Sequence, residues 1–457
     1  MVQVLTLATP ELGDRSYLIH DGEQAIVVDP QRDIDRMTAL AAEAGVAIGC
    51  VAETHIHNDY VSGGWALSQS LGATYLVAGA DQVSFARRPM GDGDRVPVGV
   101  MTVEALATPG HTSSHLSFVV WDGPRPRALF SGGSLLYGAV GRTDLVAPDL
   151  TEELARAQHR SARRLAHLPD ELELYPTHGF GSFCSSGSTS SAPGAGDQRT
   201  LGAQRTANPA LREEEQEFVR ELLAGYTLYP RYYEQMAPLN LKGGAPMDLS
   251  LPPVVEVAEV GRRIRAGEWV VDLRPRTEFG PEHVAGTVNF PIGEQLATYL
   301  GWVVPWGAPL TLLDQSAEVV GRARRDLARI GIDHLAGWSP APHQELQQSL
   351  GNSSYQVTDF QGLAQALRSS DVQVLDVRRP DEWHERHIQG SINIHLPDLP
   401  TRLHELPERL TWVHCAGGYR AAVAASLLDR AGREVVLVDD DIVRLDQVGL
   451  ELVVGPG

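Results

Sequence analysis

The sequence predicts a multidomain α/β protein, and three observations favour this fold class. The chain has 457 residues, which is too long for one hydrophobic core and suits two to four domains. Up to about residue 180, short apolar runs typical of β-strands alternate with turns and helical stretches. The second half holds an internal repeat, and each copy of it opens with an apolar strand.

The composition narrows the classes of partner. Hydrophobic residues make up 43% of the chain and charged residues 21%, as in ordinary globular proteins. A formal net charge of -20 argues against nucleic acid and against an anionic membrane, because both require a basic surface. The N-terminus lacks the pattern of a secretory signal, and no run approaches about 18 consecutive apolar residues. We therefore expect neither export nor a membrane span.

The cysteine content predicts a cytoplasmic location. Cys50, Cys184 and Cys415 form an odd, sparse set, which is not a disulfide framework. Such a set fits a reducing compartment, where a thiol can do chemistry. The sequence does not fix the oligomeric state, and a homo-oligomer is compatible with it.

Residues 1–246 are expected to form one layered α/β domain. The strand-like runs and the helical stretches of this part are 16–30, 50–57, 116–123, 34–45 and 151–168. A stretch rich in Ser, Gly and Pro, 185–202, predicts a surface loop or linker. Cys184 precedes it and could meet a substrate, although a partly buried structural cysteine is the favoured interpretation.

The repeat predicts two further α/β domains, over 252–350 and 355–457. Residues 270–291 resemble residues 374–395. The matched pairs, all at one offset, are Asp272 and Asp376, His283 and His387, Gly286 and Gly390, and Asn289 and Asn393. Each copy ends with a strand, a loop and a helix, which suggests two small domains with parallel sheets.

Cys415 stands where a strand ends and a glycine-containing loop leads into an amphipathic helix. Backbone N–H groups of such a loop, and the N-terminus of the helix, stabilise a thiolate or a persulfide anion. Gly417 and Gly418 allow close approach of the backbone, and Arg420 supplies a fixed cation at the far end of the loop. This arrangement predicts a nucleophilic cysteine.

These residues resemble the rhodanese family of sulfurtransferases. The loop 415–420, Cys-Ala-Gly-Gly-Tyr-Arg, matches that family's six-residue active loop, and the element from Asp376 to Asn393 matches its first signature. A tyrosine phosphatase would need one more residue between Cys and Arg. Residues 438–443 depart from the family, which usually has two glycines there. The resemblance implies that Cys415 and Arg420 are catalytic and that Ala416, Gly417, Gly418 and Tyr419 form the substrate-binding loop.

The middle copy departs at the position of the nucleophile. Aligning residues 310–331 on residues 410–432 places Asp314 where the C-terminal copy has Cys415. An aspartate cannot carry a persulfide. The middle domain is therefore expected to be an inactive rhodanese-like module with a structural or docking role.

Histidines follow the ends of three strands in the first domain. His55 and His57 are spaced i and i+2 on an extended segment, so their side chains point the same way. His111 and His178 each follow another strand, and Asp59 lies two residues beyond His57. We expect these strands to end at one shared edge of a sheet sandwich, where the histidines would form a metal site.

The order of these motifs resembles the metallo-β-lactamase fold, in its glyoxalase II and persulfide dioxygenase branch. The resemblance implies an αββα sandwich and, for a persulfide dioxygenase, one iron held by His55, His111 and an aspartate. The aspartate should fall in residues 129–145, where this chain has Gly133 instead. Tyr60 stands where the family motif ends in histidine, so zinc hydrolysis through two metals is disfavoured.

The donors that remain predict a site for one divalent metal, iron or zinc. The expected set is His55, His57 and His111, with Asp59 and His178 as weaker members. Such a set could hold the metal with an open coordination position, and it could also be vestigial.

The order of the domains resembles natural fusions of a persulfide dioxygenase with a sulfurtransferase. It implies an enzyme of persulfide metabolism, in which Cys415 takes sulfur from thiosulfate or a small persulfide and passes it to a thiol acceptor. The first domain would oxidise thiol persulfides or serve as a scaffold. Two alternatives stay open, a zinc-dependent thioester hydrolase of the glyoxalase II type and a non-enzymatic persulfide sensor or sulfur carrier.

Overall fold

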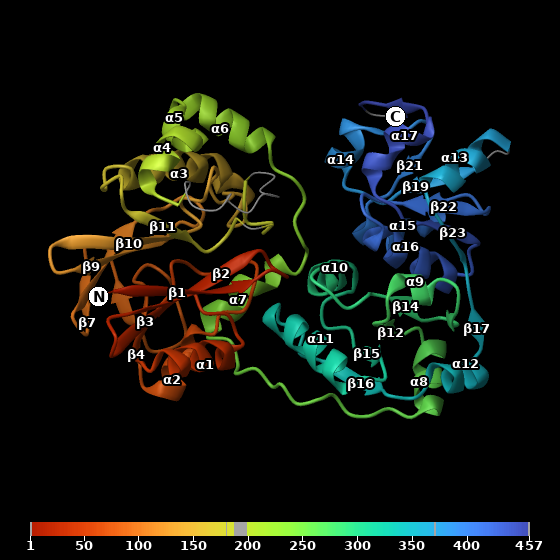
Figure 1. Cartoon of the computed structure of the whole chain (residues 1–457), viewed down its shortest axis with the longest axis horizontal. Helices are drawn as coiled ribbons and strands as arrows, with labels where there is room; N and C mark the ends of the chain where they lie inside the picture. Colours follow the sequence, from red (N-terminus) through yellow and green to blue (C-terminus); the bar gives the residue numbers. More distant parts are fainter. Residues whose placement is uncertain (1, 180, 187–198, 370–371, 456–457) are drawn as a thin grey trace. The chain divides into compact units, whose positions relative to one another are not determined.

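The computed structural model describes residues 2–179, 181–186, 199–369 and 372–455 and divides into two compact units. The first unit comprises Met1–Asp248 and Ala328–Gly331, and the second comprises Leu249–Leu327 and Ile332–Gly457. Figure 1 shows each unit built around its own β-sheets, flanked by helices.

Two sheets form the centre of the first unit. One has six strands in the order β1-β2-β3-β4-β5-β6, and the other has five in the order β11-β10-β9-β8-β7. The six strands are β1 (Gln3–Thr9), β2 (Asp14–His20), β3 (Gln24–Val28), β4 (Ala47–Ala52), β5 (Thr74–Ala78) and β6 (Arg88–Met90). The five strands are β7 (Arg95–Val98), β8 (Met101–Ala107), β9 (Leu116–Asp122), β10 (Arg125–Gly132) and β11 (Glu173–Pro176).

The burial of apolar side chains explains why these sheets stack. Residues from both sheets, such as Val28 and Phe118, share one buried cluster. The outer face of the six-stranded sheet buries Val27 against Met37 of α1 (Ile34–Ala44), near α2 (Gly64–Leu71). The outer face of the other sheet buries Leu129 under α3 (Thr151–Leu165). This confirms the αββα sandwich.

The remaining helices of the first unit follow the last strand. They are α4 (Leu201–Ala207), α5 (Pro209–Arg212), α6 (Glu215–Ala224) and α7 (Tyr233–Lys242). Residues 187–198, most of the stretch expected to be a loop, lie outside the described residues. The last two residues of that stretch, Leu201 and Gly202, begin α4. The Thr200 side chain caps this helix by accepting a hydrogen bond from the backbone N–H of Ala203 (3.3 Å).

Two parallel sheets form the second unit, as the repeat predicts. The middle copy holds β12 (Trp269–Asp272), β14 (Val288–Asn289), β15 (Leu310–Leu313) and β16 (Leu335–Ser339) in the order β14-β12-β15-β16. The C-terminal copy holds β18 (Gln356–Thr358), β19 (Gln373–Asp376), β21 (Ile392–Asn393), β22 (Thr411–His414) and β23 (Val435–Val438) in the order β18-β23-β22-β19-β21. Two small pairs, β13 (His283–Val284) with β17 (Asn352–Ser353) and β20 (His387–Ile388) with β24 (Leu452–Val453), complete the strands.

Helices connect the strands of both copies (Figure 1). Those of the middle copy are α8 (Val257–Arg265), α9 (Arg276–Phe279), α10 (Leu296–Val303), α11 (Ala317–Arg329) and α12 (His343–Leu350). Those of the C-terminal copy are α13 (Phe360–Ser369), α14 (Pro380–Glu385), α15 (Leu399–Arg402), α16 (Tyr419–Arg430) and α17 (Leu445–Val448).

The two copies use their matched residues in the same way. The side-chain amide of Asn289 donates to the carbonyl of Asp272 (3.1 Å), and that of Asn393 donates to the carbonyl of Asp376 (2.9 Å). In each copy this bond links two neighbouring parallel strands at their ends. The repeated residues therefore encode the fold of each copy.

One apolar core joins the two copies into a single unit. It contains Val271 and Leu312 of the middle copy together with Leu375, Val413 and the nucleophile candidate Cys415 of the C-terminal copy. The two copies are therefore packed against each other and not only tethered. The division near residues 350–355 stays a prediction.

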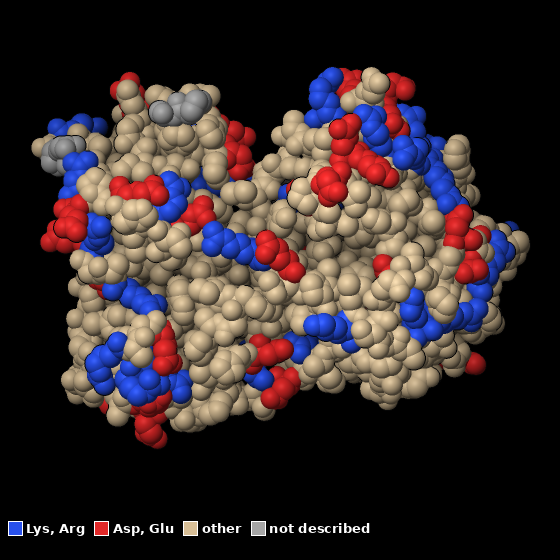
Figure 2. All heavy atoms as spheres, turned by 180° about the vertical axis from the view of Figure 1, so that it is seen from behind, with Lys and Arg blue, Asp and Glu red and all other residues tan. Residues whose placement is uncertain are grey.

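The surface carries charges of both signs. On the face drawn in Figure 2, Lys and Arg side chains lie beside Asp and Glu side chains. One ion pair at the surface joins Arg95 and Glu104, with an N–O distance of 3.1 Å. Within the described ranges, every helix is too short or too polar to cross a bilayer.

Candidate functional sites

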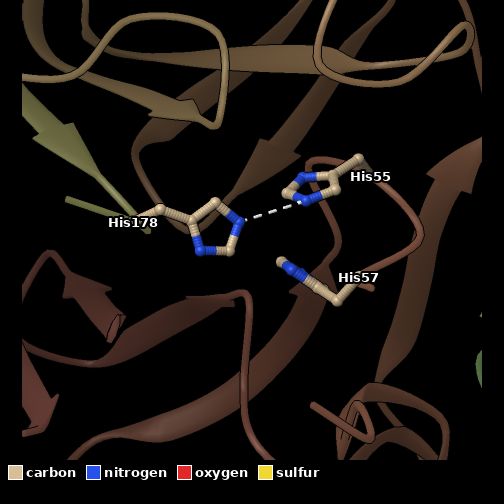
Figure 3. A group of neighbouring side chains, drawn as sticks. All are labelled: His55, His57 and His178. Carbon is tan, nitrogen blue, oxygen red and sulfur yellow. Dashed lines mark hydrogen bonds between the residues drawn. The ribbon is translucent and has the colours of Figure 1, made fainter. Parts of the chain in front are cut away.

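The four histidines predicted from the sequence meet at one end of the first unit. His55 and His57 follow β4, His111 follows β8 and His178 follows β11. Each is at most 1% exposed. Figure 3 shows His55, His57 and His178 converging, and the Nε2 atoms of His55 and His178 lie 3.2 Å apart. The expectation that these strands end at one edge is met by this geometry.

The donor atoms gather in groups that differ from the expected set. Four overlapping groups have donor atoms within 4.8 Å of one another: His55, His57 and His178; His111, His178 and Cys184; Asp14, Asp59 and His178; and Asp29, Glu53 and His57. Among the described residues, none of these groups joins His111 to both His55 and His57. His178, the weaker candidate, belongs to three of the four.

His111 is held as a neutral ligand-like imidazole. Its Nδ1 donates to the carbonyl oxygen of Arg142 at 2.6 Å, which leaves a lone pair on Nε2. Burial, together with the nearby charge of His178, lowers the pKa of His111 to about 3. Its Nε2 is buried and makes no hydrogen bond with the residues that the structure describes. Metal-bound histidines are commonly oriented through such a bond from the other ring nitrogen.

His178 lies between two buried carboxylates. Its Nδ1 is 2.8 Å from Asp14 and 3.2 Å from Asp59. Burial disfavours the charged imidazole, but the charges of Asp59 and Asp14 outweigh that effect and raise the pKa of His178 to about 10. The carboxylates hold the Nδ1 side of the charged ring, and Nε2 points towards His55.

His57 is engaged by partners on its Nε2 side. That atom lies 3.0 Å from the Tyr60 hydroxyl, 3.1 Å from Glu53 and 3.4 Å from Asp29. Burial opposes protonation, yet the Asp29 charge and the hydrogen bonds raise the pKa of His57 to about 9. Tyr60 stacks on the His57 ring, with centroids 4.3 Å apart, and fills the position of the family's last motif histidine.

Gly133 leaves no room for the family carboxylate. A Cβ atom at this residue would lie 2.2 Å from Cδ2 of His111. The Gly133 N–H donates to Nε2 of His115 at 3.0 Å, and the His115 ring stacks on His55 with centroids 5.0 Å apart. The sequence analysis missed His115, whose only signal was its place immediately before a strand.

The residues fit one metal ion better than two. His111 offers an orphaned buried nitrogen, and a single ion beside it would find further buried donors in His178 and Cys184. A second ion would need the carboxylate that Gly133 lacks and the histidine that Tyr60 replaces.

Cys184 is fully buried, whereas the sequence favoured a partly buried structural cysteine. Burial, followed by the charges of Asp59 and Asp14, raises the pKa of the Cys184 thiol well above its usual range. Its Sγ belongs to the group formed with His111 and His178.

Cys415 lies where the motif places it, directly after β22 and before α16. Cys415 is only 2% exposed, and the backbone N–H of Gly418 points to its Sγ at 3.2 Å. The helix begins at Tyr419. A backbone donor and a helix N-terminus therefore both face the sulfur.

Arg420 is fixed, but by a partner that the motif did not reveal. Its guanidinium forms a bidentate pair with Glu382 of α14, at 2.6 and 2.8 Å. The signal for Glu382 was its place inside the signature from Asp376 to Asn393. The positive charge of Arg420 is therefore neutralised within the protein.

Replacing Glu382 by glutamine should destabilise the second unit by about 2 kcal/mol, because it leaves Arg420 buried without its anion. Although burial opposes ionisation, the hydrogen bonds and charge of Arg420 lower the pKa of Glu382 to about 2, from the model-peptide value of 4.5. The pair thus stabilises the fold fully above pH 4.5, and its contribution is lost as the pH falls towards 2. Urea unfolding between pH 3 and pH 7 should show that the gap between wild type and variant narrows in acid; a constant gap would contradict this.

Gly418 is required by its backbone and by its neighbour. Its φ is +86°, and a Cβ atom there would meet the carboxylate of Asp439 at 1.9 Å. Asp439 accepts a hydrogen bond at 2.7 Å from Arg276 of the middle copy. The acidic sequence 438–443, which departs from the family, thereby links the loop to the other copy.

Gly418→Ala should therefore lower stability by about 2 kcal/mol, through the left-handed backbone and the clash with Asp439. Gly417→Ala is the matched control, because a Cβ atom at that position would meet no atom of the described residues within 4 Å. Thermal unfolding of the full chain separates the two variants. Equal midpoints for both would show that the clash is relieved without cost.

Asp314 occupies the corresponding point of the middle copy, directly after β15. It accepts a hydrogen bond from the backbone N–H of Ser316 at 2.8 Å. A cavity of about 110 Å³ lies beside it, lined by Asp272 and His343 among others. The described lining of that cavity offers a carboxylate where the C-terminal copy offers a thiol.

The chain combines two kinds of domain. One is an αββα sandwich with buried histidines at one edge, and the other has a parallel sheet that carries a cysteine loop. The metallo-beta-lactamase superfamily model matches residues 12–178, and the rhodanese-like domain model matches residues 359–445. The chain belongs to the metallo-β-lactamase superfamily and carries a rhodanese-like domain in its C-terminal part.

The proteins similar to the first unit include hydrolases and dioxygenases. A hydroxyacylglutathione hydrolase of Pseudomonas entomophila (strain L48) is 30% identical over 183 residues, which are 39% of this chain and 67% of the relative. The mitochondrial persulfide dioxygenase of Homo sapiens is 27% identical over 234 residues, 50% of this chain and 84% of the relative.

A solved structure resembles more of the chain. The crystal structure of a metallo-beta-lactamase from Staphylococcus aureus subsp. aureus COL is 28% identical, with a TM-score of 0.65. The match covers 74% of this chain and 99% of that chain. The similarity therefore extends beyond the first unit.

Proposed function

We propose that the chain is an enzyme of sulfane-sulfur metabolism in which Cys415 carries sulfur as a persulfide. The observation that supports this most strongly is the Gly418 N–H directed at Cys415 Sγ, at the N-terminal end of α16. A preorganised donor and a helix N-terminus stabilise negative charge on sulfur, both in the thiolate and in the persulfide anion.

The reaction is a transfer in two displacements. The Cys415 thiolate attacks the outer sulfur of thiosulfate; a new S–S bond forms, the donor's S–S bond breaks and sulfite leaves with the electron pair. An acceptor thiolate then attacks the outer sulfur of the persulfide and releases the Cys415 thiolate. No external oxidant or reductant is needed. A small organic persulfide can replace thiosulfate as donor.

The loop accounts for the choice of a small anionic donor. Gly417 is exposed and Ala416 partly so, whereas Cys415 is buried, so a donor approaches over the loop. Because Glu382 neutralises Arg420, the charge of the donor is met chiefly by backbone N–H groups. The three cysteines are free thiols, and we place the protein in the reducing cytoplasm.

A second function, oxidation of thiol persulfides at the first unit, is supported by the similarity to persulfide dioxygenase and by the neutral His111, whose Nε2 makes no hydrogen bond with the described residues. A bound iron would supply oxygen activation there. Metal analysis paired with oxygen uptake on glutathione persulfide, under iron-replete conditions, tests it. About one iron per chain together with oxygen consumption would support this function. A chain that binds no iron and consumes no oxygen would leave Cys415 as the supported catalytic centre.

Thioester hydrolysis is less well supported, although hydrolases are among the relatives. Tyr60 and Gly133 stand where a second metal would need ligands. A sensor or carrier role is distinguished by kinetics, since a carrier would form the Cys415 persulfide once without net turnover.

A further inference from the structure

Three donors from three separate loops meet in the interior of the first unit. Cys184 Sγ, His111 and His178 have ligand atoms within 4.8 Å of one another, and all three residues are fully buried. We propose that Cys184, as a thiolate, binds a divalent transition metal together with His111 Nε2 and the imidazole of His178. Cysteine then supplies the anionic ligand that Gly133 cannot. This inference is independent of sulfur transfer at Cys415.

Arg142 positions two of these ligands from one short segment. Its carbonyl oxygen accepts the Nδ1–H of His111 at 2.6 Å, and its own N–H donates to the carbonyl of Cys184 at 2.9 Å. Its guanidinium donates to the carbonyl of Phe183 (3.2 Å) and is anchored by Asp144 at 2.7 Å. Arg142 thereby links the loop that carries Cys184 to His111.

An unpartnered polar atom at this point indicates a bound cation. His111 Nε2 is buried and makes no hydrogen bond with the described residues. Asp59 lies 3.2 Å from Nδ1 of His178. Buried polar atoms without partners are rare in native proteins and call for a bound group. Asp14 and Asp59 would orient His178 from behind, as outer partners of metal-bound histidines do.

The other histidine group differs in its donors. His55, His57 and His178 are all imidazoles, so a dication among them would have no anionic ligand within the group. His57 directs Nε2 to Glu53 and Asp29, and its Nδ1 is buried without a hydrogen bond to the described residues. The group with Cys184 joins two nitrogens to one sulfur, a donor set that favours zinc or iron(II) over magnesium or calcium.

Binding releases protons from two of the three ligands. When the metal–sulfur bond forms, the Cys184 S–H bond breaks and the proton leaves to solvent, so that the thiolate offsets one of the two charges of the metal. His178, which Asp14 and Asp59 hold as an imidazolium, also gives up the proton of the nitrogen that binds the metal. His111 needs no deprotonation, because its Nε2 already carries a lone pair.

Cobalt(II) provides a test that does not depend on activity. Titrating metal-free full-length chain with Co²⁺ should give one tight equivalent and a near-ultraviolet sulfur-to-cobalt charge-transfer band. Cys184→Ser should lose this band, whereas Cys415→Ser, the matched control in the other unit, should retain it. Binding without the band in wild type, or a band that persists in Cys184→Ser or vanishes in Cys415→Ser, would overturn the proposal.

A second measurement keeps the test valid if Cys184→Ser does not fold. X-ray absorption of the zinc-loaded Cys415→Ser chain leaves Cys184 intact and requires no change at the site. One sulfur neighbour at about 2.3 Å from zinc is expected. A shell of nitrogen and oxygen alone would exclude Cys184 as a ligand, while leaving sulfur transfer at Cys415 untouched.

Discussion

Cys415→Ser should reduce the transfer of sulfur from thiosulfate to a thiol by roughly 10³-fold or more, because serine removes the only atom in the loop that can hold sulfane sulfur. The substitution is nearly isosteric, so the Gly418 N–H should still point to the side chain. Steady-state rates with a small thiol acceptor measure the effect, and unfolding curves should stay close to those of the wild type.

Cys50→Ala is the matched thiol control for this prediction. Cys50 is also buried, lies on β4 of the first unit and belongs to none of the donor groups. Its loss should leave sulfur transfer within twofold of wild type, or about 0.4 kcal/mol in activation free energy. If Cys415→Ser kept normal activity while Cys50→Ala lost it, the nucleophile would be misassigned.

Gly133→Asp should destabilise the first unit by about 3 kcal/mol and should not create an iron site of the family type. The reason is steric, since a Cβ atom at Gly133 would overlap the His111 ring at 2.2 Å. The displaced His111 would lose its bond to the Arg142 carbonyl. Thermal unfolding and metal analysis of the full chain measure both parts of the prediction.

Two alanine variants isolate the steric cause. Gly133→Ala adds only the clashing methyl group and should retain most of the loss in stability. Gly321→Ala, in α11, is the control, because the nearest atom to its Cβ would be 3.9 Å away and alanine favours a helix. A Gly133→Asp chain that unfolds like wild type and gains one iron would show that the site can accept the carboxylate.

The sequence could predict those features that are written in short motifs. The loop around Cys415 is contiguous, so its strand, turn and helix follow from six residues and their flanks. The repeat made the strand ends predictable, because Asn289 and Asn393 donate the same hydrogen bond to the carbonyl of the matched aspartate, Asp272 or Asp376. The histidine edge was predictable because each histidine directly follows a strand.

Other parts of the sites depend on contacts between distant residues. Cys184 meets His111 only because the segment at Arg142 bonds to both, and no spacing in the sequence records that link. Arg420 was expected to act as a cation for the loop, yet Glu382 neutralises it across the fold. His57 was an expected ligand; Glu53 and Asp29 occupy its Nε2 side, which leaves Nδ1 as its buried donor atom.

The central claim, that Cys415 carries sulfur, is tested most directly by intact-protein mass spectrometry after brief exposure to one equivalent of a sulfane-sulfur donor. We expect a mass increase of one sulfur atom per chain, mapped by proteolysis to the peptide that contains Cys415, and its removal by an added thiol. An unmodified Cys415, or added sulfur found only on Cys50 or Cys184, would contradict the account.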